Sequence, residues 1–101
     1  MEVRLERHAT QLGALGHPIR LAILHYVVQG HADGTAVHQI QCKLEIPSST
    51  LSHHIERLAS AGLLKARREG TYIYYRADYE QLKSLTDYLW EDCCQHGNGC
   101  C

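Results

Sequence analysis

Apolar residues recur at helical spacing through the first half of the chain. Residues 2–15 predict an amphipathic helix, and a second helix is expected to begin at Pro18 and to end at Gly30. Proline suits the first turn of a helix because its missing N–H would have no partner there. A third helix is predicted from about Thr35 to just before Pro47, since a residue that precedes proline is pushed out of the helical region. The apolar stripe of the first helix comprises Leu5, Ala9, Leu12 and Leu15.

A fourth helix is predicted directly after Pro47. Ser48 or Ser49 is expected to cap its amino end, because a serine hydroxyl accepts a hydrogen bond from a free backbone N–H. The buried edge of this helix is predicted to comprise Leu51, Ile55 and Leu58. Residues 45–48 leave only a tight connection to the preceding helix, so the two helices form a candidate helix-turn-helix unit.

The remainder of the chain predicts a hairpin and one more helix. Residues 63–68 and 72–76 are rich in apolar and aromatic side chains, which is typical of strands, and Gly70 between them suits a tight turn. Asp78 is expected to cap the last helix. The apolar stripe of that helix comprises Tyr79, Leu82, Leu85 and Leu89. Four helices, a hairpin and a helix in this order predict a mainly α fold with a small β-hairpin, a winged helix-turn-helix.

Length and charge narrow the class of protein. A chain of 101 residues is expected to form one folded domain over residues 1–92, followed by a flexible cysteine-rich tail over residues 93–101. No apolar run reaches the roughly 18 residues that a membrane-spanning helix needs, and the amino end lacks a signal-peptide core, so a cytoplasmic protein is expected. The net charge is −1, but residues 43–76 carry +3 and residues 77–101 carry −4. A polyanion would therefore be attracted to the middle of the chain.

Three groups of motifs occur in order along the sequence. They are Gly-His-Pro-Ile-Arg-Leu-Ala-Ile-Leu at 16–24, Pro-Ser-Ser-Thr-Leu-Ser-His-His-Ile-Glu-Arg-Leu at 47–58, and the Ala-Gly-Leu-Leu, Arg-Arg-Glu-Gly and Tyr-Tyr-Arg segments within 61–76. In this order they resemble the ArsR/SmtB family of metal-responsive repressors, and the similarity extends over about residues 5–90. The resemblance implies a homodimer that pairs its first and last helices, an apo state that binds double-stranded operator DNA, and an effector that releases the DNA.

The fourth helix and the hairpin carry side chains that suit contact with DNA. Small hydroxyls approach base edges closely and both donate and accept hydrogen bonds, while arginines bind phosphates. The predicted DNA-binding residues are Ser48, Ser49, Thr50, Ser52, His53 and Arg57 in the helix, with Arg67 and Arg68 in the hairpin. Three alternatives stay open: a serine caps the helix, His53 or His54 packs against the core, and the paired arginines belong to an ordinary soluble surface.

Four of the five cysteines lie in the last nine residues of the sequence. Disulfides that stabilise a small fold are spread along it, so this cluster is better explained as a ligand set. Trivalent arsenic and antimony form three bonds to soft sulfur ligands. Cys93, Cys94 and Cys100 are therefore the preferred site for arsenite or antimonite as effector, and Cys101 is either a substitute ligand or idle. The arrangement is similar to that of arsenical-responsive family members. Cys42, the one cysteine near the third helix, is expected to be a buried apolar residue.

Other uses of the cysteine cluster stay open. Four thiols, or three with His96, suit zinc or cadmium, although residues 78–92 offer no histidine for a zinc site between last helices. Cys93 and Cys94 alone suit a methylated trivalent arsenical, and oxidation would join two thiols in a disulfide. A thiol redox enzyme is disfavoured because no cation or helix amino end is placed to activate these thiols. No catalytic residues are predicted, and a DNA-binding module without an effector is the last alternative.

Overall fold

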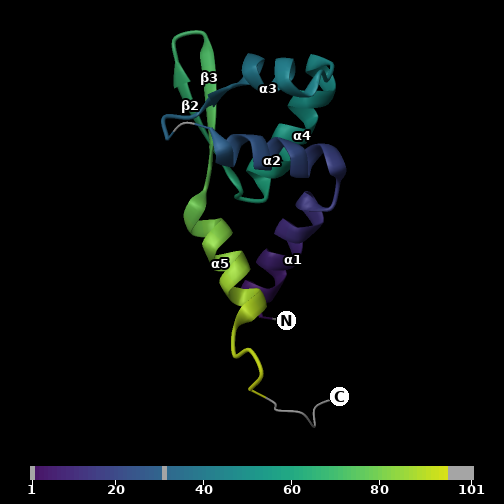
Figure 1. Ribbon diagram of the computed structural model, residues 1–101, viewed down its shortest axis with the longest axis vertical. Helices are drawn as coiled ribbons and strands as arrows, with labels where there is room; N and C mark the ends of the chain where they lie inside the picture. Colours follow the sequence, from purple (N-terminus) through teal and green to yellow (C-terminus); the bar gives the residue numbers. More distant parts are fainter. Residues whose placement is uncertain (1, 31, 96–101) are drawn as a thin grey trace.

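A computed structural model describes residues 2–30 and 32–95 of the protein (Figure 1). The elements are α1 (Val3–Leu15), α2 (Pro18–Gln29), β1 (Thr35–Ala36), α3 (Val37–Leu44), α4 (Ser48–Ser60), β2 (Leu64–Glu69), β3 (Tyr72–Ala77) and α5 (Tyr79–Trp90). They confirm the predicted mainly α, winged helix-turn-helix fold. Figure 1 shows α3, α4 and the β2–β3 hairpin at one end of the molecule, and α1 beside α5 at the other.

Of the two helix caps predicted from the sequence, the one by Asp78 is confirmed, and His17 provides a further cap that was not predicted. His17 caps α2, its Nδ1 accepting a hydrogen bond from the Ile19 N–H at 3.2 Å, and Asp78 caps α5 by accepting from the Gln81 N–H at 3.2 Å. The prediction that Ser48 or Ser49 caps α4 is wrong. Pro47 takes the capping position with an extended backbone, so both serines already lie in the first helical turn and expose their side chains.

The hairpin belongs to a three-stranded antiparallel sheet in the order β1-β3-β2. Leu64 pairs with Ala77 at its base, and Gly70 takes a positive φ of 63° in the tight turn at its tip. Thr35 pairs with Tyr75 of β3, which the sequence prediction of a helix from Thr35 did not anticipate. A short extended segment satisfies the open edge of β3 before α3 begins.

The core lies between α2, α3, α4 and the base of the hairpin. The predicted edge of α4 is confirmed, since Leu51, Ile55 and Leu58 are all buried. They pack with a set of other buried apolar side chains: Ala14, Ile23, Leu24, Val27, Ile40, Ile46, Leu63, Leu64 and Ala77. The recognition element of the helix-turn-helix is therefore held on its inner face by the main core of the molecule.

The apolar stripe predicted on α1 is only partly covered in a single chain: Leu15 packs against the core and Leu5 is half-buried, whereas Leu12 is 43% exposed and Ala9 is exposed as well. The buried residues of α1 are His8, Gln11 and Ala14. On α5, Leu85 is buried and Leu82 is packed against the core, but Tyr79 and Leu89 of the predicted stripe are largely exposed. Within the described residues, no helix has the length and apolar character needed to cross a bilayer.

Candidate DNA-binding surface and thiol site

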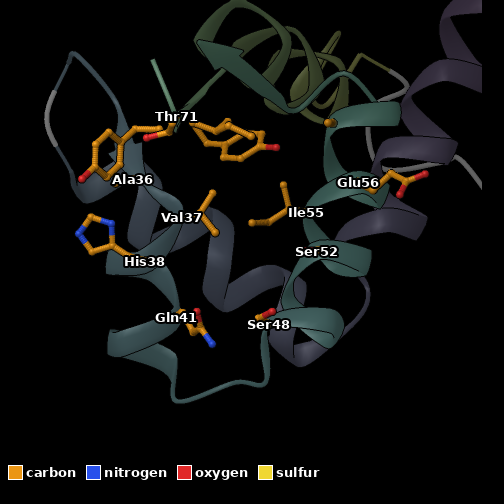
Figure 2. A pocket seen from close by; sticks show the side chains of 13 residues that line it. Ala36, Val37, His38, Gln41, Ser48, Ser52, Ile55, Glu56 and Thr71 are labelled. Atoms are coloured by element: carbon orange, nitrogen blue, oxygen red, sulfur yellow. The ribbon is translucent and has the colours of Figure 1, made fainter. Parts of the chain in front are cut away.

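The predicted DNA-binding side chains of α4 lie on three sides of its exposed surface. Ser49 and His53 lie about one helical turn apart, so they share one side of α4, and both are exposed. Ser48 and Ser52 border a groove of about 680 Å³ between α3, α4 and β3, in which Val37 and Ile55 point inward (Figure 2). The rim of this groove continues from α4 to the β2–β3 hairpin, which is the wing of the fold. The same groove is lined by Ala36, His38, Gln41, Glu56, Ala59, Thr71, Tyr72, Ile73 and Tyr75.

Thr50 and Arg57 occupy the other flank of α4. Thr50 is half-buried, and Arg57 is exposed. Arg57 lines a second cavity, of about 380 Å³, on the side of α4 that faces α1 and α2. Arg57 is therefore separated from the serines that border the groove toward the wing.

His53 and His54 differ in burial, which resolves one alternative left by the sequence. His54 is buried, with its ring centroid 4.7 Å from that of His17, while His53 is exposed. The Nδ1 of His54 is buried and has no hydrogen-bond partner among the described residues. Burial lowers the pKa of His54, and the positive charges of His17, Arg20 and His53 lower it further.

The two wing arginines have different surroundings. Arg67 is paired with Glu69, donates a hydrogen bond from Nη2 to the Asp33 carbonyl oxygen at 3.0 Å, and lies 4.7 Å from the ring centroid of Tyr74. The hydrogen bond to Glu69 is the main reason that the pKa of Arg67 is raised. Arg68, next along the strand, projects from the opposite face and is exposed.

The thiols that the structure describes follow directly after α5. Cys93 and Cys94 are exposed, and their Sγ atoms lie 3.5 Å apart. Two sulfurs at this distance are able to bond one central atom, since metal–thiolate bonds measure about 2.3 Å. No three His, Cys, Asp or Glu side chains gather into a metal site within residues 2–30 and 32–95. The predicted third ligand, Cys100, lies outside the described residues, as do Cys101 and His96.

The prediction that Cys42 is buried is wrong. Its side chain is exposed. The buried line of α3 passes through Ile40, with Val37 and Leu44 packed beside it, and a position two residues after Ile40 falls on the far side of the helix.

Next to the thiols, the end of α5 is tied to the start of α1. Glu91 accepts two hydrogen bonds from the Arg4 guanidinium, at 2.7 and 2.8 Å, and Arg4 lies 4.9 Å from the ring centroid of Tyr88. These hydrogen bonds from Arg4 lower the pKa of Glu91. The sequence prediction missed this pair, because 87 positions separate its members and no local pattern links them.

Known proteins with similar sequences are transcriptional regulators. A family model described as a helix-turn-helix domain matches residues 15–67. The uncharacterized HTH-type transcriptional regulator YbzH of Bacillus subtilis is 39% identical over 75 residues, covering 74% of this chain and 75% of YbzH. The biofilm growth-associated repressor of Agrobacterium fabrum is 33% identical over 94 residues, covering 93% of this chain and 78% of the repressor.

Solved structures with similar folds indicate the family of regulators to which the chain belongs. The homodimeric winged helix-turn-helix DNA-binding domain of Mb0332 from Mycobacterium bovis, a possible ArsR-family regulator, has a TM-score of 0.68 and 32% identity, covering 96% of this chain and 90% of that one. A possible transcriptional regulator for arsenical resistance has a TM-score of 0.68 and 27% identity, covering 85% and 90% of the two chains. This chain belongs to the ArsR/SmtB family.

In this ArsR/SmtB regulator, a buried polar network joins α1, α5 and the end of α4. The Nδ1 of His8 donates to the Gln11 side-chain oxygen at 2.9 Å, which leaves His8 Nε2 as the acceptor for the Ser84 hydroxyl at 3.4 Å. The Gln11 amide then donates to the Gln81 side chain at 2.9 Å and to the Ala61 carbonyl at 3.3 Å. Because Ala61 caps the carboxyl end of α4, the network links the α1–α5 pair to the helix with most of the predicted DNA contacts.

Proposed function

We propose that this protein is a homodimeric repressor that binds operator DNA in its apo state and releases it when trivalent arsenic or antimony bonds to Cys93, Cys94 and Cys100. The observation that carries the proposal is the pair of exposed, adjacent thiols 3.5 Å apart at the end of α5. Soft thiolates select thiophilic ions over hard, oxygen-seeking ones. Membership of the family and the similarity to a possible arsenical-resistance regulator support this choice of effector.

DNA binding is assigned to α4 and the wing. Ser48, Ser49 and Ser52 carry no capping role, so their hydroxyls are available to base edges and phosphates. Thr50 and His53 complete the reading surface on α4, and the amino end of that helix favours a phosphate. Arg57, Arg67 and Arg68 supply positive charge, with Arg68 the more available of the two wing arginines because Arg67 is engaged by Glu69.

The homodimer is assigned to α1 and α5. These helices leave apolar side chains exposed that a second copy would cover: Val3, Leu12, Tyr79, Leu89 and Trp90. A single chain of this size benefits from such a partner, because it buries a smaller share of its surface than a larger domain does. The homodimeric state of the similar Mb0332 domain supports the assignment.

The effector is proposed to act through the end of α5. We divide the chain at residue 92, with a folded domain before it and an effector-binding tail from 93 to 101. Closing three thiols around one atom pulls on the segment next to Glu91, whose pair with Arg4 holds α5 against α1. Movement of α1 then reaches Ala61 through Gln11. Release requires that the effector bind the non-operator form more tightly, by a factor of about 10⁴ to reverse a 99:1 preference.

The test follows the release of labelled operator DNA by fluorescence anisotropy, with the operator first selected from random duplexes by the wild-type protein. We expect arsenite to release the wild type, and Cys93→Ser or Cys94→Ser to raise the required concentration at least about tenfold, a loss of about 1.4 kcal/mol of binding or more. Cys42→Ser removes another exposed thiol and is the matched control. Undiminished release of the Cys93→Ser, Cys94→Ser double variant by arsenite contradicts the proposal.

A methylated trivalent arsenical is the second candidate effector. The observation that favours it is that two thiols already lie together at residues 93 and 94, and this ligand has two bonds left for protein. The Cys100→Ser, Cys101→Ser double variant separates the two candidates, because it also removes the substitute ligand. It abolishes the response to arsenite but leaves the response to the methylated compound if two thiols suffice. Zinc, cadmium and the thiol oxidant diamide, added in parallel, identify the other effectors that the cysteines would accept.

A further inference from the structure

A polar cavity of about 380 Å³ lies where α1, α2 and α4 meet. Arg20 contributes from α2, Arg57 and Ser60 from α4, and Thr10 from α1. Gly13, Ala14 and Ala61 complete the lining. Two arginines and two hydroxyl-bearing residues thus line one cavity, and no acidic residue lines it among the described residues.

The positive charge of this cavity is not balanced from within the described part of the chain. Arg4, Arg67 and Lys83 each pair with a carboxylate there, whereas neither Arg20 nor Arg57 does. The Nε of Arg20 is buried and has no hydrogen-bond acceptor among the described residues. A buried donor without an acceptor is unfavourable, so the cavity is better satisfied when an acceptor enters it.

The geometry points to a binding site for a phosphate-type oxyanion, held by Arg20 and Arg57. A guanidinium group presents its N–H donors in a planar fork that matches the oxygens of phosphate, and hydroxyl donors such as Thr10 and Ser60 suit the remaining oxygens. The volume is within the range of small-molecule pockets, about 300–1,000 Å³, so a phosphate with a small attached group also fits.

The same chemistry has two sources, a free phosphate compound and a phosphate of the DNA backbone. Arg57 belongs to α4, the helix that carries the proposed base contacts. A phosphate of the bound DNA backbone is therefore one of the two possible occupants. In either case the anion bridges α4 to α2, and it favours the orientation of α4 seen here. This site is independent of the thiols at the end of α5.

The first arm of the test titrates the intact protein with inorganic phosphate, replacing chloride at constant ionic strength. Binding is followed by NMR of the Arg20 and Arg57 side-chain Nε–H groups. Gly13→Leu is the sharpest variant, because Gly13 lines the cavity and a side chain there meets open space, so it fills the site without changing any charge. Arg57→Gln removes a proposed ligand, and Lys83→Gln on α5 is the control for loss of one positive charge.

The second arm measures operator affinity against salt concentration for the same variants. A saturable phosphate response that weakens at least about tenfold in Gly13→Leu and Arg57→Gln, but not in Lys83→Gln, supports a free-anion site. A salt slope that falls by about one in both cavity variants, without a response to free phosphate, supports a DNA phosphate as occupant. If both variants behave like wild type in both arms, the oxyanion site is overturned.

Discussion

His54 is a buried histidine in a chain that exposes its immediate neighbour, His53. The ring of His54 packs on His17 between α2 and α4, and Arg20 and His53 add positive charge around it. Burial and these charges favour the neutral ring. Protonation of His54 in acid therefore opposes the packing of α4, the proposed DNA-reading helix, on α2.

The stability of the fold is accordingly expected to fall on acidification. The pKa of His54 is lowered below its usual value of about 6.5, so the neutral ring stabilises the fold above that pH. This contribution is lost as the pH falls from about 6.5 through the lower pKa of the folded state. Urea unfolding at about pH 7.5 and about pH 5.5 should show a smaller loss for His54→Leu than for wild type. His53→Leu, at an exposed site, should keep the wild-type pH dependence; equal dependence in all three proteins contradicts this account.

Single residues were predictable where the chemistry is local. Asp78 caps its helix as expected, because the signal is an aspartate at the start of an apolar helical pattern. The serines of α4 have the same signal and do not cap, because Pro47 takes the capping position one residue earlier. Burial of Cys42 was predicted from residue type alone, whereas its position on α3 decides its exposure.

Within the hairpin, alternation along β2 divides the two arginines between the faces of the sheet. Within the hairpin, Arg67 pairs with Glu69 and lies over the ring of Tyr74. Its hydrogen bond to the Asp33 carbonyl ties the hairpin to the segment before β1. Arg68 faces the other way and has no ion-pair partner among residues 2–30 and 32–95. The hairpin thus combines one arginine that supports its shape with one that is available to an anion.

We expect the wing to contribute electrostatically to operator binding. Arg68→Ala should weaken binding and lower the slope of log affinity against log salt by about one, because one phosphate contact is lost. Arg67→Ala alone should change the slope less, since Glu69 already neutralises this side chain. Operator titrations over a range of salt concentrations measure both. If the double variant keeps the wild-type slope, the wing makes no phosphate contact.

The pairing of α1 with α5 was the least predictable part of the fold. Periodicity identified an apolar stripe on α1, but in this chain the neighbouring, partly polar face is the more deeply buried one. His8 and Gln11 are accommodated there because partners from α4–β2 and α5 satisfy them, and those partners are 50 and 70 positions from Gln11. A pattern shows which face of a helix is apolar, but it does not show whether the same chain or a second copy covers that face.

In the whole molecule, the end of α5, which Cys93 and Cys94 follow in the chain, lies at the opposite end from α4 and the hairpin, the proposed DNA-binding elements (Figure 1). A ligand at Cys93 and Cys94 therefore has to influence α4 through α1 and α5, or through the spacing of two subunits. Both routes use the same helices. Two recognition helices match successive half-sites only if the dimer holds them about 34 Å apart. The proposed repressor thus depends on dimerisation for affinity as well as for regulation.

Leu89 tests that dependence, because it is 57% exposed on α5 with Trp90 beside it at 72%. Covering a leucine contributes about 1.5–3 kcal/mol, and a symmetric dimer contains the residue twice. Leu89→Asp should therefore weaken dimerisation by at least about 100-fold, as measured by sedimentation equilibrium, and lower affinity for a two-half-site operator much more than for a single half-site. Leu21→Asp places the same charge on α2, outside the two helices of the proposed interface, at a leucine that is 54% exposed, and should leave the dimer intact. A wild-type protein that is monomeric, or a Leu89→Asp dimer as stable as the Leu21→Asp dimer, would exclude the α1–α5 interface.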